Sequence, residues 1–169
     1  MKKLFLCAAI AVFGLSNIYA QGGFKLGANG ALPIGDAGDV SSFSTGVDVA
    51  YFFDINEKFI VGPAAGFTNA FGKTETITVG NTNIEFSYDD VQFMPIAGAA
   101  RFLPTDKFYV GADIGYAIGI NDGNDGGFYY RPRAGYSITD LIGVNVSYTG
   151  ISADGGDWST IGAGIEFSF

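Results

Sequence analysis

Apolar and polar residues alternate almost perfectly in the C-terminal segment from Trp158 to Phe169. One face carries Ile161, Ala163, Ile165, Phe167 and Phe169, and the other carries Thr160, Gly162, Gly164, Glu166 and Ser168. A period of two is typical of a β-strand with one apolar and one polar face. Similar stretches recur along the chain, so the pattern predicts an all-β protein.

The recurring alternation predicts eight antiparallel strands that close into an up-and-down transmembrane β-barrel. The strands are expected at 22–33, 41–53, 58–71, 88–103, 107–120, 127–138, 141–152 and 158–169. A tilted strand needs about 9–11 residues to cross a bilayer, and each predicted strand supplies at least that many. The connections are tight turns at 54–57, 104–106 and 139–140, and longer segments at 34–40, 72–87, 121–126 and 153–157. Short periplasmic turns and longer outer loops are typical of outer-membrane barrels.

The N-terminus has the layout of a secretory signal peptide. Lys2 and Lys3 precede an apolar run over 4–15, and Ala20 supplies a small residue at the expected cleavage site. The run is shorter than the roughly 20 residues of a membrane helix, and Cys7 comes too early in it to be a lipidated cysteine. We therefore expect residues 1–20 to be a cleaved signal peptide and residues 21–169 to form one barrel domain without cysteine.

Composition agrees with a membrane barrel and narrows the chemistry. The chain has 26 glycines, 16 phenylalanines and 9 tyrosines, which suit a narrow lumen and aromatic membrane interfaces. Loss of Lys2 and Lys3 with the signal would change the net charge from −8 to −10, which argues against nucleic acid as a partner. With no histidine, Ser-His mechanisms and imidazole metal ligation are excluded. A mechanism based on lysine or a carboxylate stays formally open, but no residue cluster singles it out. We expect no enzymatic activity, cofactor or metal site.

The predicted inward faces carry a set of charged residues with balanced signs. They are Lys25, Asp48, Asp113, Arg131, Arg133 and Glu166. Asp113 and Arg133 fall on neighbouring strands at similar depth, and Lys25 and Glu166 fall where the barrel closes. An unpaired buried charge costs several kcal/mol, so we expect these groups to pair. An eight-stranded barrel is just wide enough for its own side chains, which favours a filled lumen over a conduction path.

The fourth predicted strand is ambiguous. An inward Arg101 puts Met94, Ile96 and Phe102 on the lipid face, but it also puts Phe93 and Pro95 inside. Pro63, Pro95 and Pro132 lie within predicted strands, where proline removes a donor from the ladder. We expect bulges or local irregularity at these prolines.

The predicted outer loops are strongly acidic, with Lys73 as their only clear positive charge. The acids are Asp36, Asp39, Glu75, Glu85, Asp89, Asp90, Asp122, Asp125, Asp154 and Asp157. The segment 121–127 superficially resembles a calcium loop but lacks the distal glutamate of an EF-hand, so solvated loops and weak divalent-cation binding both remain open. The 72–87 loop reads as a hairpin around Gly80-Asn81, either a site for a surface partner or a charged extension.

The strand pattern and the terminal Ile165-Glu166-Phe167-Ser168-Phe169 resemble the small eight-stranded outer-membrane barrel domains, the OmpA/OmpX-like family. The resemblance covers 21–169 and implies the outer membrane of a Gram-negative bacterium, with lipid as partner. It also implies that Phe167 and Phe169 form part of a signal for the outer-membrane assembly machinery. We expect a monomer.

Three functions remain open from the sequence. They are a non-enzymatic structural or surface-interaction protein, a small-solute or ion channel, and a secreted lipocalin-like binder. The last predicts an apolar interior and a polar exterior. Here the apolar face carries the bulky residues and the polar face is rich in glycine, which favours lipid outside.

Overall fold

A computed structural model describes residues 23–79, 82–153 and 156–169. The expected signal peptide and Asp154 lie outside the described residues. Eight strands form a closed barrel in the order β1-β10-β9-β8-β7-β6-β3-β2, with all neighbours antiparallel. The barrel strands are β1 (Gly23–Ile34), β2 (Ser41–Asn56), β3 (Phe59–Gly72), β6 (Val91–Phe102), β7 (Phe108–Gly119), β8 (Gly127–Ser137), β9 (Ile142–Ala153) and β10 (Gly156–Ser168). The predicted eight-stranded barrel is confirmed.

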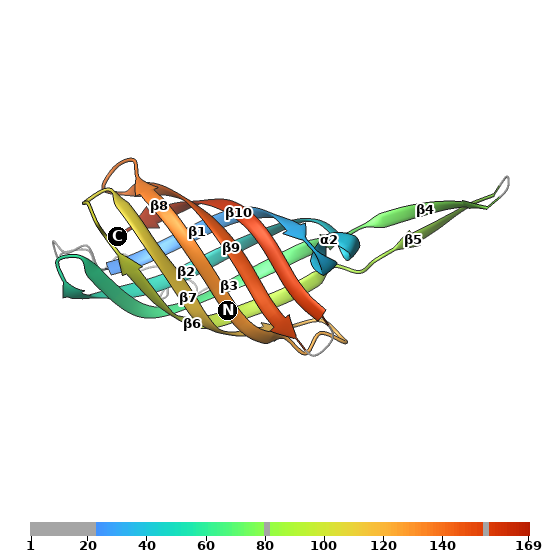
Figure 1. Cartoon of the computed structure of the whole chain (residues 1–169), viewed down its shortest axis with the longest axis horizontal. Helices are drawn as coiled ribbons and strands as arrows, with labels where there is room; N and C mark the ends of the chain where they lie inside the picture. The colour runs from blue at the N-terminus through green and yellow to red at the C-terminus, as the bar shows by residue number, and fades with distance from the viewer. Residues whose placement is uncertain (1–22, 80–81, 154–155) are drawn as a thin grey trace, which may run out of the picture.

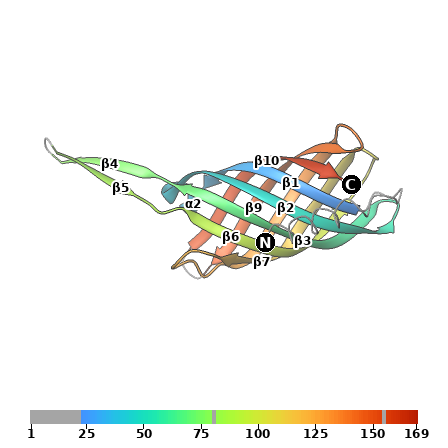
Figure 2. The ribbon, with the colours of Figure 1, turned by 180° about the vertical axis from the view of Figure 1, so that it is seen from behind.

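The barrel closes where the first strand pairs with the last. The register runs from Lys25 opposite Ser168 to Ile34 opposite Ser159. Figure 2 shows β10, β1 and β2 side by side at this seam. Closure leaves no free sheet edge in the barrel, as a strand structure inside a bilayer requires.

The two faces of the barrel wall differ as the alternation predicts. Large apolar side chains point outward and are exposed, among them Leu32, Val47, Ile96, Ile114, Val146 and Ile161. Aromatic pairs lie toward both ends of this apolar band. The pairs are Phe24–Phe169, Tyr51–Phe53 and Phe59–Phe102 near the end that holds the C-terminus, and Phe128–Tyr130 and Tyr130–Tyr148 near the other end. An apolar band flanked by aromatic girdles is the lipid-facing surface of an outer-membrane barrel.

Three short turns connect strands at the end that holds the C-terminus. Side-chain oxygens accept backbone N–H groups in each turn: Asn56 from Lys58 and Phe59, Thr105 from Phe108, and Thr139 from Ile142. Side-chain acceptors of this kind stabilise tight turns. The first turn lies at 57–58 rather than 54–57, because β2 continues to Asn56.

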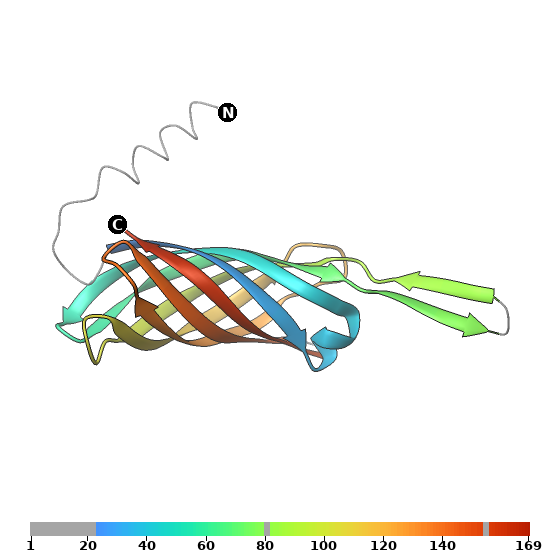
Figure 3. The same cartoon turned by 90° about the horizontal axis from the view of Figure 1, so that it is seen from above.

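A hairpin projects from the opposite end of the barrel, far beyond the other connections (Figures 1 and 3). It consists of β4 (Thr74–Val79) and β5 (Thr82–Ser87), which form a separate two-stranded sheet between β3 and β6. The predicted hairpin is therefore present. At its base lies α2 (Asp36–Val40), one helical turn that the sequence analysis treated as loop. No helix among the described residues is long and apolar enough to cross a membrane.

No β-bulge lies at the prolines, but the expected local irregularity is present beside each of them. The register stays in phase, whereas partner pairs are missing from the ladder beside Pro63 in β2–β3, Pro95 in β3–β6 and Pro132 in β8–β9. A proline leaves one ladder hydrogen bond unmade, but it does not need an extra residue in the strand. The register shifts lie instead in β2–β3, between Ser41 and Phe43 and between Asp54 and Asn56.

Candidate functional site

Charged side chains from three strands meet in the middle of the lumen. Arg131 Nη2 lies 2.7 Å from Asp48 Oδ1 and 2.8 Å from Asp113 Oδ2. Arg133 Nη2 contacts the same two carboxylates at 3.1 and 2.9 Å. Asp113 is 2% exposed, so its charge is neutralised by partners rather than by bulk water. β2 and β8 are not neighbours, so these contacts span the barrel interior.

A second group of charges lies around Glu166 of β10. Arg101 of β6 donates two parallel hydrogen bonds to its carboxylate, each of 2.7 Å. Parallel bonds of this kind are the strongest form of arginine–carboxylate pairing. Arg133 Nη1 lies 3.7 Å from the same carboxylate and thereby joins the two groups into one network. Lys25 Nζ lies 3.8 Å from Glu166 and donates to Ser168 Oγ at 2.8 Å.

The structure thus brings all six sequence-selected lumen charges together and adds Arg101, which that selection missed. With Arg101 the network has four cations and three anions, so the signs nearly balance, as expected. The alternation of β6 was the sequence signal for Arg101, because residues an even number of positions apart share one face of a strand. Phe93 is buried like Arg101, whereas Met94 and Ile96 on the other face are exposed. Its guanidinium also stacks over the rings of Phe52 and Tyr109, at 4.4 and 4.3 Å from their centroids.

Inward glycines make room for this network. Gly27 pairs with both Asp48 and Glu166 on its two neighbouring strands. A Cβ at Gly27 would lie 1.9 Å from Asp48 Oδ2. Gly111 likewise stands opposite Arg101 and Arg133. Small residues beside large charged ones therefore let the lumen of eight strands close over an arginine network.

Apolar clusters close the lumen on either side of the charges. Phe52, Ile60, Ala64 and Ala99 pack together toward the end with the short turns. Phe93, Ala117, Tyr129 and Ile151 pack together toward the hairpin end, with Trp158 against them. Among the described residues, cavities of about 10 and 30 Å³ lie in this part of the lumen. A single water needs about 10–15 Å³, so cavities of this size are too small for a continuous column of water.

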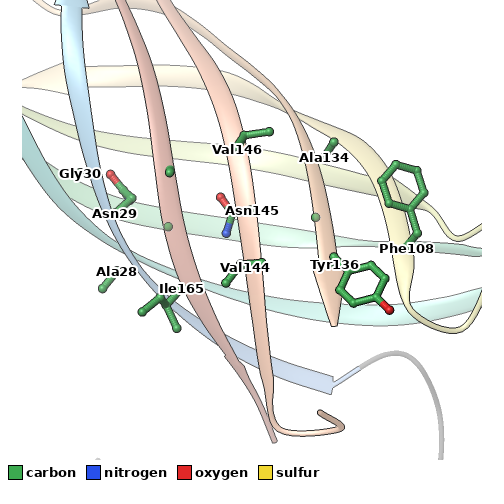
Figure 4. Close-up of a pocket in the computed structure, with 13 residues that line it drawn as sticks. Ala28, Asn29, Gly30, Phe108, Ala134, Tyr136, Val144, Asn145, Val146 and Ile165 are labelled. Carbon is green, nitrogen blue, oxygen red and sulfur yellow. The ribbon is translucent and has the colours of Figure 1, made fainter. Parts of the chain in front are cut away.

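A shallow hollow also lies on the outside of the barrel. It is a shallow groove of about 730 Å³ across β1, β10, β9, β8 and β7. Figure 4 shows Phe108 and Tyr136 at one side of it and Ala28 and Ile165 at the other. This surface belongs to the apolar band, which in an outer-membrane barrel faces the hydrocarbon chains of the bilayer.

Contacts with α2 and with β3 fix the base of the hairpin. Lys73 donates its backbone N–H to Val40 O at 2.9 Å and its ammonium to Gly38 O. Asp90 accepts hydrogen bonds from the Asn69 amide and the Gly72 backbone N–H, both 3.0 Å. These bonds hold the pKa of the Asp90 carboxyl below its usual range. The hairpin therefore emerges from a braced base rather than from a loose loop.

The remaining sequence-selected residues lie at the rim and in the outer loops. Phe169 stands beside Phe24 and donates its backbone N–H to Phe24 O at 2.9 Å, and Phe167 pairs with Leu26. In the described part of the chain, no three acidic or other metal-ligating side chains converge on one point.

Comparison with solved structures shows that the chain shares the fold of small transmembrane β-barrels. Ail from Yersinia pestis in a phospholipid nanodisc has a TM-score of 0.57, with 12% identity over 88% of this chain and 99% of that one. Crystalline Ail with the heparin analogue sucrose octasulfate has a TM-score of 0.50, with 13% identity over 88% and 97%. A de novo designed transmembrane β-barrel has a TM-score of 0.53, with 9% identity over 90% and 98%.

No curated protein sequence matches the chain. The family model described as outer membrane protein beta-barrel domain matches residues 5–169. This match covers nearly the whole chain and agrees with the closed barrel, its apolar outer band and its charged lumen. The chain therefore belongs to the outer membrane protein beta-barrel domain family.

Proposed function

We propose that this protein is a non-enzymatic outer-membrane anchor that presents the β4–β5 hairpin for interactions at the cell surface. The observation that carries the proposal is the hairpin itself, which extends beyond a barrel whose lumen is filled. Outer-membrane barrels place their short turns in the periplasm, so the hairpin end faces the exterior. A braced, projecting hairpin on a filled barrel suits recognition better than transport.

The charge network supports a structural role for the lumen rather than a catalytic one. Every acid of the network contacts an arginine at 3.1 Å or closer. A carboxylate held by arginines is a poor general base, because its pairing favours the ionised form and occupies its lone pairs. The chain also has no histidine to shuttle protons.

Export, assembly and stoichiometry form part of the same proposal. Residues 1–20 act as a cleaved signal, Phe167 and Phe169 contribute to recognition by the assembly machinery, and the barrel stays a monomer in lipid. The closed seam supports the last point, because the barrel offers no free strand edge for a second copy.

A channel is the second candidate. The observation in its favour is the outer half of the lumen, where Ser44, Thr68 and Thr160 line a cavity of about 30 Å³. Conduction would require the aromatic cluster above this cavity and the arginine network below it to move apart. A lipocalin-like role has no such support, since the interior is charged and the exterior apolar.

Site-specific photocrosslinking in intact cells tests the proposal. A photoreactive amino acid at Phe86 of the hairpin should give protein adducts at the cell surface, whereas the same group at lipid-facing Phe108 should not. Both side chains are exposed, at 53% and 39%, so exposure alone does not distinguish them. Equal adducts at both positions, or none at Phe86, would remove the surface-interaction role.

A further inference from the structure

We infer that the hairpin docks a cationic polypeptide that also carries apolar side chains, and that it does so through one face of the β4–β5 sheet. The inference rests on the proposed surface-interaction role and names the chemistry of the partner. Three features of the hairpin lead to it: an exposed apolar face, the position of its two glutamates, and the charge of the surrounding loops.

One face of the hairpin exposes apolar side chains to water. Ile84 and Phe86 alternate with Asn83, Glu85 and Ser87, so they share one face of β5. They are 42% and 53% exposed, although this sheet stands outside the membrane band. A two-stranded hairpin cannot bury such a face by itself, so an apolar partner surface is needed to cover it.

The two glutamates of the hairpin lie on opposite faces. Glu75 stands directly opposite Phe86, and Glu85 stands directly opposite Thr76. Directly opposed residues of an antiparallel pair project to the same side. Glu75 therefore accompanies the apolar pair, and Glu85 lies on the polar face with the threonines. The docking face thus combines apolar groups with a negative charge.

The surroundings of the hairpin extend this negative charge. Among the described residues of the outer end, the acids are Asp36, Asp39, Glu75, Glu85, Asp89, Asp90, Asp122, Asp125 and Asp157. Lys73 is the one basic residue there, and its ammonium donates to Gly38 O. A field of one sign attracts partners of the opposite sign and repels its own.

This charge selects among the possible occupants of the face. A second copy would bring a second acidic end against the first, and like charges oppose that contact. A sulfated glycan such as the heparin analogue bound to Ail would meet the same repulsion. A basic polypeptide with alternating or clustered apolar residues satisfies both the apolar pair and the acids.

Binding of defined peptides to the full barrel in zwitterionic lipid nanodiscs tests the inference. The probe is a short synthetic peptide that alternates lysine with valine, and its control alternates glutamate with valine. We expect saturable binding of the lysine peptide alone at about 0.15 M salt, where exposed charges are well screened. Phe86→Ser should weaken it about ten- to a hundredfold, since it removes one buried aromatic contact.

The two glutamates supply a matched pair of variants. Glu75→Gln should weaken binding about threefold, and Glu85→Gln should weaken it less. Equal loss in both variants, or no loss in Phe86→Ser, would mean diffuse attraction to the acidic end and would overturn the face-docking inference. Dimers that Phe86→Ser abolishes would assign the face to a second copy. Absence of lysine-peptide binding, together with adducts at Phe86 in cells, would overturn the inference and leave the proposed function standing.

Discussion

At the residue scale, Arg101 holds Glu166 far more closely than Lys25 does. Arg101 makes two bonds of 2.7 Å, whereas Lys25 stands 3.8 Å away near the periplasmic mouth. Removal of one member of a buried ion pair costs about 3–5 kcal/mol, and a partly solvated pair contributes about 1 kcal/mol or less. We therefore expect Arg101→Met to destabilise the barrel much more than Lys25→Met.

Double-mutant cycles with Glu166→Gln measure both couplings from urea unfolding in lipid vesicles. The Arg101–Glu166 coupling should clearly exceed the Lys25–Glu166 coupling. Equal couplings would contradict the geometry, and strict additivity for both pairs would mean that neither pair stabilises the closed barrel.

Gly135 provides a second test at this scale. A Cβ at Gly135 would meet the buried ring of Tyr109 at 2.3 Å, which leaves no room for a methyl group. Gly135→Ala should cost about 1–3 kcal/mol, because overpacking forces the ring off its position. Gly98→Ala is the control, since its Cβ meets only Ile114 O at 4.0 Å. Equal unfolding midpoints for the two variants would contradict this packing argument.

At the element scale, the Asp90 contacts brace the hairpin in a pH-dependent way. Hydrogen bonds from Asn69 and Gly72 lower the pKa of Asp90, so the brace is complete above about pH 4, the ordinary range of aspartate. It weakens as the pH falls through the lowered folded-state pKa. We expect hydrogen exchange at the Gly72 amide to be slow at neutral pH and to lose its extra protection at low pH.

Asp90→Asn should show weakened protection at Gly72 already at neutral pH, since it removes the charge from the acceptor. Asp89→Asn is the matched control, because it removes a neighbouring exposed carboxylate without touching the bonds to Gly72. A similar change in both variants would mean that general charge, and not the Asp90 brace, protects the hairpin base.

The strands themselves were largely predictable, and the reasons are physical. A lipid-facing wall needs apolar residues at every second position, so the period of two in β7 and β10 appears directly in the sequence. The short helix α2 was missed because five residues carry too little periodic signal. The irregularity predicted at the prolines is present as missing pairs without bulges, because proline removes a donor but inserts no residue. The two register shifts, between Ser41 and Phe43 and between Asp54 and Asn56, had no such signal in the sequence.

The pairing inside the lumen was less predictable than the wall. The alternation along a strand indicates which residues point inward, and neighbouring strands indicate contacts such as that of Asp113 with Arg133. The alternation does not indicate which residues meet across the barrel. Arg101 of β6 contacts Glu166 of β10 in this way, and Arg131 of β8 contacts Asp48 of β2. These contacts depend on the length of arginine and on the lumen diameter, which only the closed barrel defines.

At the scale of the whole molecule, Phe169 is the residue at which the proposed assembly role can be separated from a role in stability. Its ring lies 6.2 Å from that of Phe24, at the seam where the first and last strands meet. Deletion of Phe169 removes a rim contact, so we expect a small loss of stability in refolded protein but a large loss of barrel in cells. Heat-modifiable gel mobility of the outer-membrane fraction measures the second quantity. Normal levels of the deletion variant would contradict an assembly role.

The filled lumen leads to the last prediction, which concerns conduction. Two apolar clusters and a seven-residue ion-pair network occupy the barrel, and the cavities between them measure about 10 and 30 Å³. A conducting ion needs a continuous hydrated path, which these side chains interrupt at three depths. We expect the unmodified protein to give no steady conductance in planar-bilayer recordings. Asp113→Ala and Arg133→Ala should stay silent too, because each leaves both apolar clusters in place. Steady openings of the unmodified protein would favour the channel, and openings confined to the two variants would identify the ion pairs as the main barrier.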